Sequence, residues 1–220
     1  MCGRYLMTSS PSLVQDCFDL RSEPSIIATY NAAPTQCLPV VREGVDGKSC
    51  GLLRWGLIPS WAKDSSIGNR MINARSETAA EKPSFREAIR SRRCLVVADG
   101  FYEWKREGDR KRAYCFRMGD GLPFGMAGLW DRWSSPEGKM VESFTILTTG
   151  PNPMVGEVHD RMPVIIDREQ YSRWLALDLT EPGQIACLLG SYPAELMDSH
   201  EVSDHVNSPR NNDPRCIEPI

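Results

Sequence analysis

The pattern of hydrophobic and polar residues along this 220-residue chain predicts a first helix close to its start. Residues 9–22 place Leu13, Val14, Cys17 and Phe18 on one face, which is the spacing of an amphipathic helix that packs on a core. Ser10 is expected to cap its first turn with its side chain. The next residue is proline, which suits the first helical position because it lacks a backbone N–H group there.

Beyond this helix, short apolar runs alternate with turn residues, which indicates strands. The expected strands are residues 35–43, 49–56, 94–104, 113–118, 124–133, 143–149 and 159–166. Residues 44–47 and 107–112 separate neighbouring strands by turns of hairpin length. Later and shorter helices are expected at residues 84–93, 168–177 and 182–191.

Strands joined by short turns, with helices only at intervals, are typical of an α+β domain. We therefore expect a curled antiparallel or mixed β-sheet, barrel-like, with helices at its periphery. No internal repeat, low-complexity tract or linker divides the sequence. A single domain that covers residues 2–219 is expected.

The composition is that of a globular protein, with 41% hydrophobic and 25% charged residues. No apolar run approaches the roughly 20 residues that span a bilayer. The first residues lack the basic and apolar regions of a secretion signal. We therefore expect a cytoplasmic protein with no membrane partner, associated with the nucleoid if its source is bacterial.

Eight cysteines are spread through the chain without a C-x-x-C pair. Zinc sites usually need closely spaced ligands, so this spacing argues against a metal site. Cys94, Cys115 and Cys187 lie in apolar runs, where cysteine acts as a small hydrophobic residue. We expect buried free thiols, no metal and no other cofactor.

The formal net charge of −3 argues against a protein that binds nucleic acid over much of its surface. Basic residues nevertheless gather in two segments, residues 85–93 and 103–112. A local nucleic-acid groove fits these clusters, and so does a solvated helix face together with a hairpin tip. Charge alone favours the second interpretation.

Three polar residues lie in or beside apolar runs, where a buried polar group is costly unless it is satisfied or used. Aromatic neighbours would raise the pKa of Glu103 towards neutrality and suit it to proton transfer, but an exposed strand position fits equally well. Asn73 suits a capping or turn role as well as a functional one. His159 has the right chemistry for proton transfer at neutral pH, although a lone histidine is more often structural.

The start of the chain, MCGRY, has a chemistry of its own if Met1 is removed. Methionine aminopeptidases generally remove methionine before a residue this small, so we expect Cys2 to carry a free α-amine beside its thiol. An α-amine has a pKa of about 7.7–8.0, against about 10.4 for lysine. At pH 7 the neutral, nucleophilic fraction of this amine is therefore greater by roughly two to three orders of magnitude.

Seven sequence blocks occur in the order that marks the SOS-response-associated peptidase (SRAP) family. They are CGRY, YNAAPTQ, LRWGLIPSWA, INARSET, VVADGFYEW, HDRMPVI and VSDHVNSPRNND. The chain resembles a bacterial member of this family from Cys2 almost to its last residue. The resemblance implies an enzyme that senses abasic sites in single-stranded DNA and crosslinks to them. It also implies autoproteolysis, which removes residues ahead of the cysteine.

The implied reaction joins Cys2 to the aldehyde of an opened abasic sugar. The amine forms a Schiff base and the thiol then closes a thiazolidine ring, which protects the strand from breakage. By the same resemblance, Asn73 orients the opened sugar and Glu103 moves protons during imine formation and ring closure. His159 is implied to act at the sugar ring oxygen, both in opening and in release of the crosslink.

The resemblance also implies contacts with DNA beside the lesion. Arginines would hold phosphates, tryptophans would stack or act as a wedge, and two asparagines would support the pocket or contact a phosphate. The residues in question are Arg4, Arg75, Arg161, Trp55, Trp61, Asn207 and Asn211. The expected partner is single-stranded DNA with an abasic site, including one at a single-strand–double-strand junction, bound by a monomer.

Two other functions fit parts of the sequence. One is an N-terminal-nucleophile amidohydrolase that acts through the Cys2 thiol, which the acidic isoelectric point mildly favours. The other is a reader of single-stranded or modified DNA that forms no covalent bond and uses Cys2 only structurally. The basic clusters and the order of the blocks favour a DNA-binding protein over the amidohydrolase.

Overall fold

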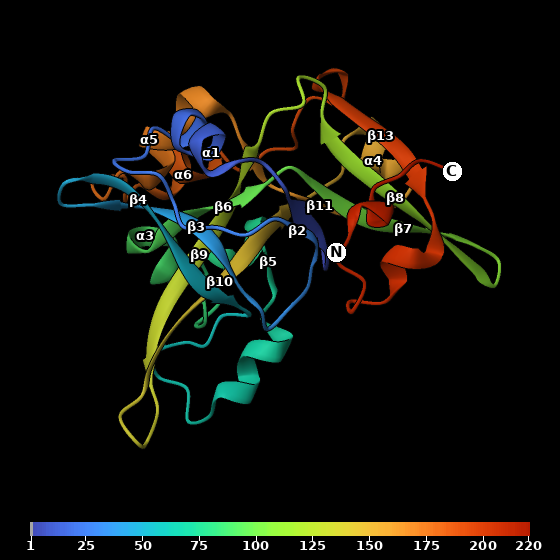
Figure 1. Ribbon diagram of the computed structural model, residues 1–220. Coiled ribbons are helices and arrows are strands. Elements are labelled where there is room, and N and C mark those ends of the chain that lie inside the picture. Colours follow the sequence, from blue (N-terminus) through green and yellow to red (C-terminus); the bar gives the residue numbers. More distant parts are fainter. Residues whose placement is uncertain (1) are drawn as a thin grey trace.

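The computed structural model describes residues 2–220, and two β-sheets form its body (Figure 1). One sheet has the strand order β13-β8-β7-β1-β2. Its strands are β1 (Tyr5–Met7), β2 (Thr29–Ala32), β7 (Gly100–Glu107), β8 (Arg110–Met118) and β13 (Met197–Val202). Every pairing in this sheet is antiparallel, and β2 forms one of its edges.

The second sheet curls until its ends meet. Its long strands are β3 (Cys37–Gly44), β4 (Gly47–Trp55), β6 (Arg93–Ala98), β9 (Phe124–Ser134) and β10 (Met140–Thr149). They pair in the order β10-β4-β3-β6-β9, and β9 pairs again with β10 to close a barrel. The short strands β5 (Asn73–Arg75), β11 (Met162–Pro163) and β12 (Ile165–Ile166) lie against β9 and β10. This confirms the expected α+β fold with a barrel-like sheet.

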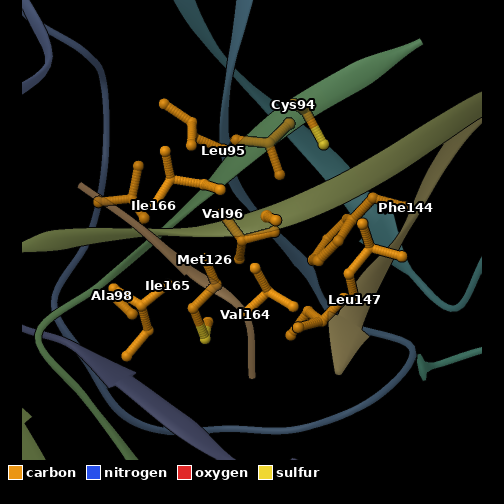
Figure 2. Close-up of a cluster of buried hydrophobic side chains, with 14 of the residues drawn as sticks. Cys94, Leu95, Val96, Ala98, Met126, Phe144, Leu147, Val164, Ile165 and Ile166 are labelled. Atoms are coloured by element: carbon orange, nitrogen blue, oxygen red, sulfur yellow. The ribbon is translucent and has the colours of Figure 1, made fainter. Parts of the chain in front are cut away.

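The barrel is built around an apolar interior. All six residues of β6 are buried, as its continuous apolar run predicts for a strand that is covered on both faces. Figure 2 shows Val96, Met126 and Leu147, from β6, β9 and β10, in one cluster of side chains. Full burial of side chains of this size contributes about 1.5–3 kcal/mol each, so this cluster stabilises the closed sheet.

Helix α1 (Pro11–Phe18) begins where the sequence predicts. Ser10 Oγ accepts a hydrogen bond from the backbone N–H of Leu13 at 3.2 Å, which is the expected N-cap contact. Phe18 stacks on Tyr171 with a centroid distance of 5.1 Å. This contact joins the first helix to α5 (Tyr171–Leu175), and α6 (Pro182–Ala186) lies beside both helices in Figure 1.

The other helices are shorter than the sequence pattern predicts. Instead of a helix over residues 84–93, only α3 (Ala88–Ser91) forms, because β6 takes up the end of that segment. The remaining α-helices are α2 (Ser76–Ala79) and α4 (Pro153–Gly156). The 3-10 helices are η1 (Ser65–Arg70), η2 (Arg168–Gln170), η3 (Ala194–Leu196), η4 (Asp204–Asn207) and η5 (Pro214–Cys216).

The segment expected as one strand at residues 159–166 is divided. β11 pairs with β10 and β12 pairs with β9, so the chain changes partner strands between Pro163 and Ile165. His159 lies before β11 and outside any strand. This division places the histidine on a loop, where its side chain can meet another part of the fold.

The cysteines of the described residues are all free. Cys94 and Cys115 are buried as predicted, whereas Cys187 is exposed, so its apolar neighbours gave the wrong expectation there. Within residues 2–220, no group of three or more His, Cys, Asp or Glu side chains is placed to hold a metal ion. The helices of this part of the chain are all too short or too polar to cross a membrane.

Candidate active site

Cys2 lies just before β1, where this strand runs between β2 and β7. The backbone N–H of Tyr102 donates to the carbonyl oxygen of Arg4 at 3.0 Å, which fixes the start of the chain against β7. The Cys2 side chain is fully buried, and its Sγ lies 3.9 Å from the same carbonyl oxygen. Burial raises the pKa of this thiol well above its ordinary value, and the negative charge of Glu103 raises it further. The thiol therefore needs a base before it can act as a nucleophile.

Asn73 reaches Cys2 from the short strand β5. This strand runs parallel to β10, and the Asn73 Nδ2 group donates to the carbonyl oxygen of Cys2 at 2.8 Å. The Asn73 Oδ1 atom is buried and accepts no hydrogen bond from the described residues. A buried acceptor without a donor costs about 1–3 kcal/mol. The amide thus holds Cys2 on one side and offers an unused acceptor on the other.

Glu103 is a buried carboxyl group on β7, with 2% of its surface exposed. It lies just beyond the stretch in which β1 pairs with β7. Burial raises its pKa to about 7, because the charged form loses hydration. A carboxyl group with this pKa can both donate and accept a proton at neutral pH.

His159 lies against Glu103, with 3.8 Å between Nε2 of the ring and Oε2 of the carboxyl group. Its Nδ1 accepts the backbone N–H of Arg161 at 3.0 Å, which turns Nε2 towards Glu103. Burial lowers the pKa of His159. When the ring is protonated, its Nδ1 can donate to Asp160 Oδ1, which lies 2.9 Å away.

The structure therefore brings together the four residues expected at the reacting centre. Asn73 is bonded to Cys2, Glu103 is close enough to shift the pKa of the Cys2 thiol, and His159 lies beside Glu103. Glu103 and His159 line an open pocket of about 440 Å³. The other lining residues are Trp104, Arg106, Lys111, Val158 and Asp160. The removal of Met1 concerns a residue outside the described part of the chain.

Arg4 ties the start of the chain to its end. Its guanidinium donates to Asn31 Oδ1 at 2.8 Å and to the carbonyl oxygens of Val206 and Asn207 at 2.9 and 3.2 Å. Figure 1 shows the N-terminus beside the C-terminal segment that carries these carbonyl groups. Several of its donors are therefore engaged within the fold, and a phosphate contact by Arg4 stays a prediction.

Asn31 was not singled out from the sequence as a candidate residue, yet it organises this junction. It is buried, and its Nδ2 group lies within hydrogen-bond distance of three carbonyl oxygens, those of Val206, Ser208 and Asn211. The only sequence signal is a polar side chain next to the apolar pair of alanines in YNAAPTQ. A buried amide of this kind fixes a backbone path because each of its polar atoms needs a partner.

The two asparagines expected in the last block make supporting contacts. Asn207 Oδ1 accepts the indole N–H of Trp104 at 2.7 Å, and Trp104 lines the pocket. Asn211 Nδ2 donates to the carbonyl oxygen of His205 at 2.7 Å. The contact of Asn207 reaches a residue of the pocket and that of Asn211 does not, so the role of each asparagine stays a prediction.

The two arginines expected near β5 differ in their surroundings. Arg161 forms a two-pronged ion pair with Glu77, at 2.6 and 2.9 Å, and also donates to the carbonyl oxygen of Thr148. Arg75 is exposed and forms no ion pair with a described residue. Arg75 is therefore available to an anion, whereas both terminal nitrogens of the Arg161 guanidinium are engaged within the fold.

Trp55 does not fit the stacking role expected for it. Its side chain is fully buried, with its ring 5.2 Å from Tyr5 and 6.3 Å from Phe144 between centroids. Its indole N–H donates to the carbonyl oxygen of Ile72 at 2.9 Å. Trp55 is a core residue, and its ring has no face open to a base.

Trp61 is 58% exposed on the loop that follows β4. Two residues of β9 hold this loop: Asp131 accepts the backbone N–H of Ser60 at 2.9 Å, and Trp133 donates its indole N–H to the carbonyl oxygen of Ala62 at 2.7 Å. The ring of Trp61 thus stands on a fixed loop and remains open to solvent. A stacking role for Trp61 stays a prediction.

Comparison with known proteins shows similarity along the whole chain. The family model of the SOS response associated peptidase (SRAP) matches residues 1–209. The abasic site processing protein YoqW of Bacillus subtilis (strain 168) is 43% identical over 223 residues, which cover 99% of each chain. The abasic site processing protein HMCES of Rattus norvegicus is 33% identical over 230 residues, or 87% of this chain and 65% of that protein. A crystal structure of a protein from Bacteroides thetaiotaomicron has a TM-score of 0.91 and 30% identity, over 100% of both chains.

Proposed function

Because this chain belongs to the SOS response associated peptidase family, we propose that it processes abasic sites in DNA through a covalent bond to Cys2. The observation that carries the proposal is the meeting of Asn73, Glu103 and His159 around this cysteine. Relatives named abasic site processing proteins support the choice of substrate. The proposal requires Cys2 to be the first residue, with its α-amine free.

The first step is condensation of the Cys2 amine with the aldehyde of the opened abasic sugar. The amine nitrogen attacks the carbonyl carbon, and the resulting carbinolamine loses water to give an imine. The departing hydroxyl needs a proton. Glu103, with a pKa of about 7, can supply it from the protonated form that is present at neutral pH.

The second step closes a five-membered ring. The Cys2 sulfur bonds to the imine carbon, and its proton passes to the ring nitrogen by way of the Glu103 carboxylate, so that no oxidant or reductant is needed. The raised pKa of the thiol makes this base necessary. Attack within one residue is favoured by effective molarities of about 10⁵ M or more. The thiazolidine contains no imine, and the strand is therefore protected from β-elimination.

Asn73 and His159 act on the sugar. The amide of Asn73 holds the Cys2 carbonyl group and keeps its Oδ1 for the amine or for a hydroxyl of the opened sugar. Nε2 of the protonated His159 ring gives a proton to the ring oxygen as the sugar opens, and it takes the proton back from the same hydroxyl when the crosslink is released. Autoproteolysis, the activity behind the family name, would act on the peptide bond before Cys2.

Denaturing gel electrophoresis tests the proposal. Protein shown by intact mass to begin at Cys2 is mixed with a single-stranded oligonucleotide that carries one abasic site. A slower band that is stable without reductant is expected for this protein and should be absent for Cys2→Ala. No band from protein that begins at Cys2 would contradict the proposal.

Cys2→Ser is the matched control because it retains the amine and loses only the thiol. It should give a band only after borohydride reduces its imine. An equally stable band without reductant would show that ring closure by sulfur is not needed. That result would overturn the thiazolidine while leaving the Schiff base.

A further inference from the structure

We propose that Arg106 and Lys111 form a phosphate-binding subsite at the mouth of the active-site pocket. They would hold the DNA backbone on one side of the lesion. The inference rests on the proposed function, since it adds a contact to the same substrate.

The two cations face each other across a hairpin. Strands β7 and β8 pair so that Arg106 lies directly opposite Lys111, and residues opposite each other in a sheet project on the same side. Figure 1 shows the tip of this hairpin projecting away from the body of the protein. Both residues border the pocket that Glu103 and His159 also line.

Neither cation has a carboxylate partner among residues 2–220. On the same hairpin, by contrast, Arg112 forms ion pairs with Glu107 and Glu201. Like charges placed directly opposite each other destabilise a strand pair. A bound anion between the two groups would remove the repulsion.

The position of Arg106 and Lys111 beside the pocket indicates that the anion is a phosphate of the DNA backbone. The strands β5 and β7 bring Asn73 and Glu103 to Cys2, and each also carries a cation further along, Arg75 on β5 and Arg106 on β7. We expect the backbone on one side of an abasic sugar bound at Cys2 to pass Arg106 and Lys111, beside Trp104 of the same pocket.

The test compares Arg106→Ala/Lys111→Ala with wild type in the full chain. Fluorescence anisotropy gives the Kd for a single-stranded oligonucleotide that contains a tetrahydrofuran abasic analogue, at salt concentrations from about 50 to 200 mM. The logarithm of the association constant falls as the logarithm of the salt concentration rises. Loss of two phosphate contacts should make this slope shallower by about 1.4. The affinity defect should therefore be about sevenfold greater at the low end of this range than at the high end. An unchanged slope would overturn the subsite.

The matched control is Lys82→Ala/Arg90→Ala. It removes the same charge from exposed residues around α3, and neither residue lines the pocket. The control should change the slope by much less than Arg106→Ala/Lys111→Ala does. Equal changes in the two variants would mean that only the overall charge matters, and the subsite would be wrong.

A second measurement tests whether the contact is one-sided. Crosslinking rates at subsaturating DNA are compared for two oligonucleotides whose abasic site lies near the 5′ end or near the 3′ end. Arg106→Ala/Lys111→Ala should slow the reaction of only one of them, and equal slowing of both would contradict the proposal. If wild type forms no crosslink, the proposed function fails, while the anisotropy comparison still decides the subsite.

Discussion

Glu103 and His159 face each other with 3.8 Å between Oε2 and Nε2, although one lies on β7 and the other on the loop after α4. Burial raises the pKa of Glu103 to about 7 and lowers the pKa of His159 below its ordinary value. These shifts reverse the usual order of the two pKa values, in which histidine has the higher one. Near pH 7 a proton shared by the pair resides mainly on the carboxyl group, which makes Glu103 the acid of the site.

Glu103→Gln should slow crosslinking by about 100-fold at pH 7, because glutamine cannot exchange a proton. In wild type, the rate should fall as the pH rises above about 7, where Glu103 loses its proton. This alkaline limb should be missing in the variant. Initial crosslinking rates at a series of pH values provide the measurement, and the same limb in both proteins would show that another group is the acid.

The same substitution should change how stability depends on pH. A carboxyl group with a folded pKa of about 7 and an unfolded pKa of about 4.3 destabilises the native state as the pH rises between these values. A glutamine side chain does not ionise. The free energy of unfolding of Glu103→Gln, relative to that of wild type, should therefore rise by about 3 kcal/mol between pH 5 and pH 8. Urea unfolding at both pH values measures this gain. If the variant and wild type differ in the free energy of unfolding by the same amount at both pH values, burial does not hold Glu103 protonated.

Asn73→Ala should slow crosslinking by about tenfold, which corresponds to about 1.4 kcal/mol in the barrier. Its effect on stability should be small, because the change removes the bond to Cys2 together with a buried acceptor that has no donor. Crosslinking rate and thermal midpoint are measured on the same preparation. A large loss of stability, or an unchanged rate, would show that this amide serves the fold rather than the reaction.

His159→Ala should slow release of the crosslink more than its formation. The reason is that Nε2 of His159 is assigned to accept the proton of the sugar hydroxyl, whose oxygen must regain its bond to the anomeric carbon on release. Formation is followed directly, and release is followed by a chase with unlabelled abasic DNA. Equal slowing in both directions is the result that would rule out this role.

Asn31→Ala should destabilise the protein by about 3 kcal/mol, because it removes a buried donor shared by three carbonyl groups and one acceptor of the Arg4 guanidinium. For a chain of this size, the thermal midpoint should fall by about 6–12 °C. Asn212→Ala is the control, since Asn212 accepts backbone N–H groups from the edge strand β2, and its loss should have a smaller effect. Equal effects would mean that Asn31 has no special place in this junction.

The sequence by itself determined the local elements of the fold. The cap at Ser10 and the spacing of Val14 and Phe18 are short-range signals, and they predicted α1 correctly. The long strands of the barrel were predicted from continuous or alternating apolar runs. The short strands β1, β2, β5 and β13 were missed, because three to six residues with mixed polarity carry too little pattern.

The sequence also pointed to Cys2, Asn73, Glu103 and His159, through the order of the blocks that contain them. Only the tertiary structure decided what surrounds each side chain. It buries Trp55, which was expected to stack on DNA, and leaves Trp61 exposed on a loop held by β9.

For the charged residues too, the sequence gives the residue type and the tertiary structure decides its surroundings. In the sequence, Arg161 and Arg106 look alike, but folding pairs the first with Glu77 and leaves the second facing Lys111 beside the pocket. The pKa of a carboxyl group and the availability of a guanidinium depend on hydration and on partners within a few ångströms. Those partners come from distant parts of the chain, so they are fixed only when β5, β7 and the loop after α4 meet around the first strand.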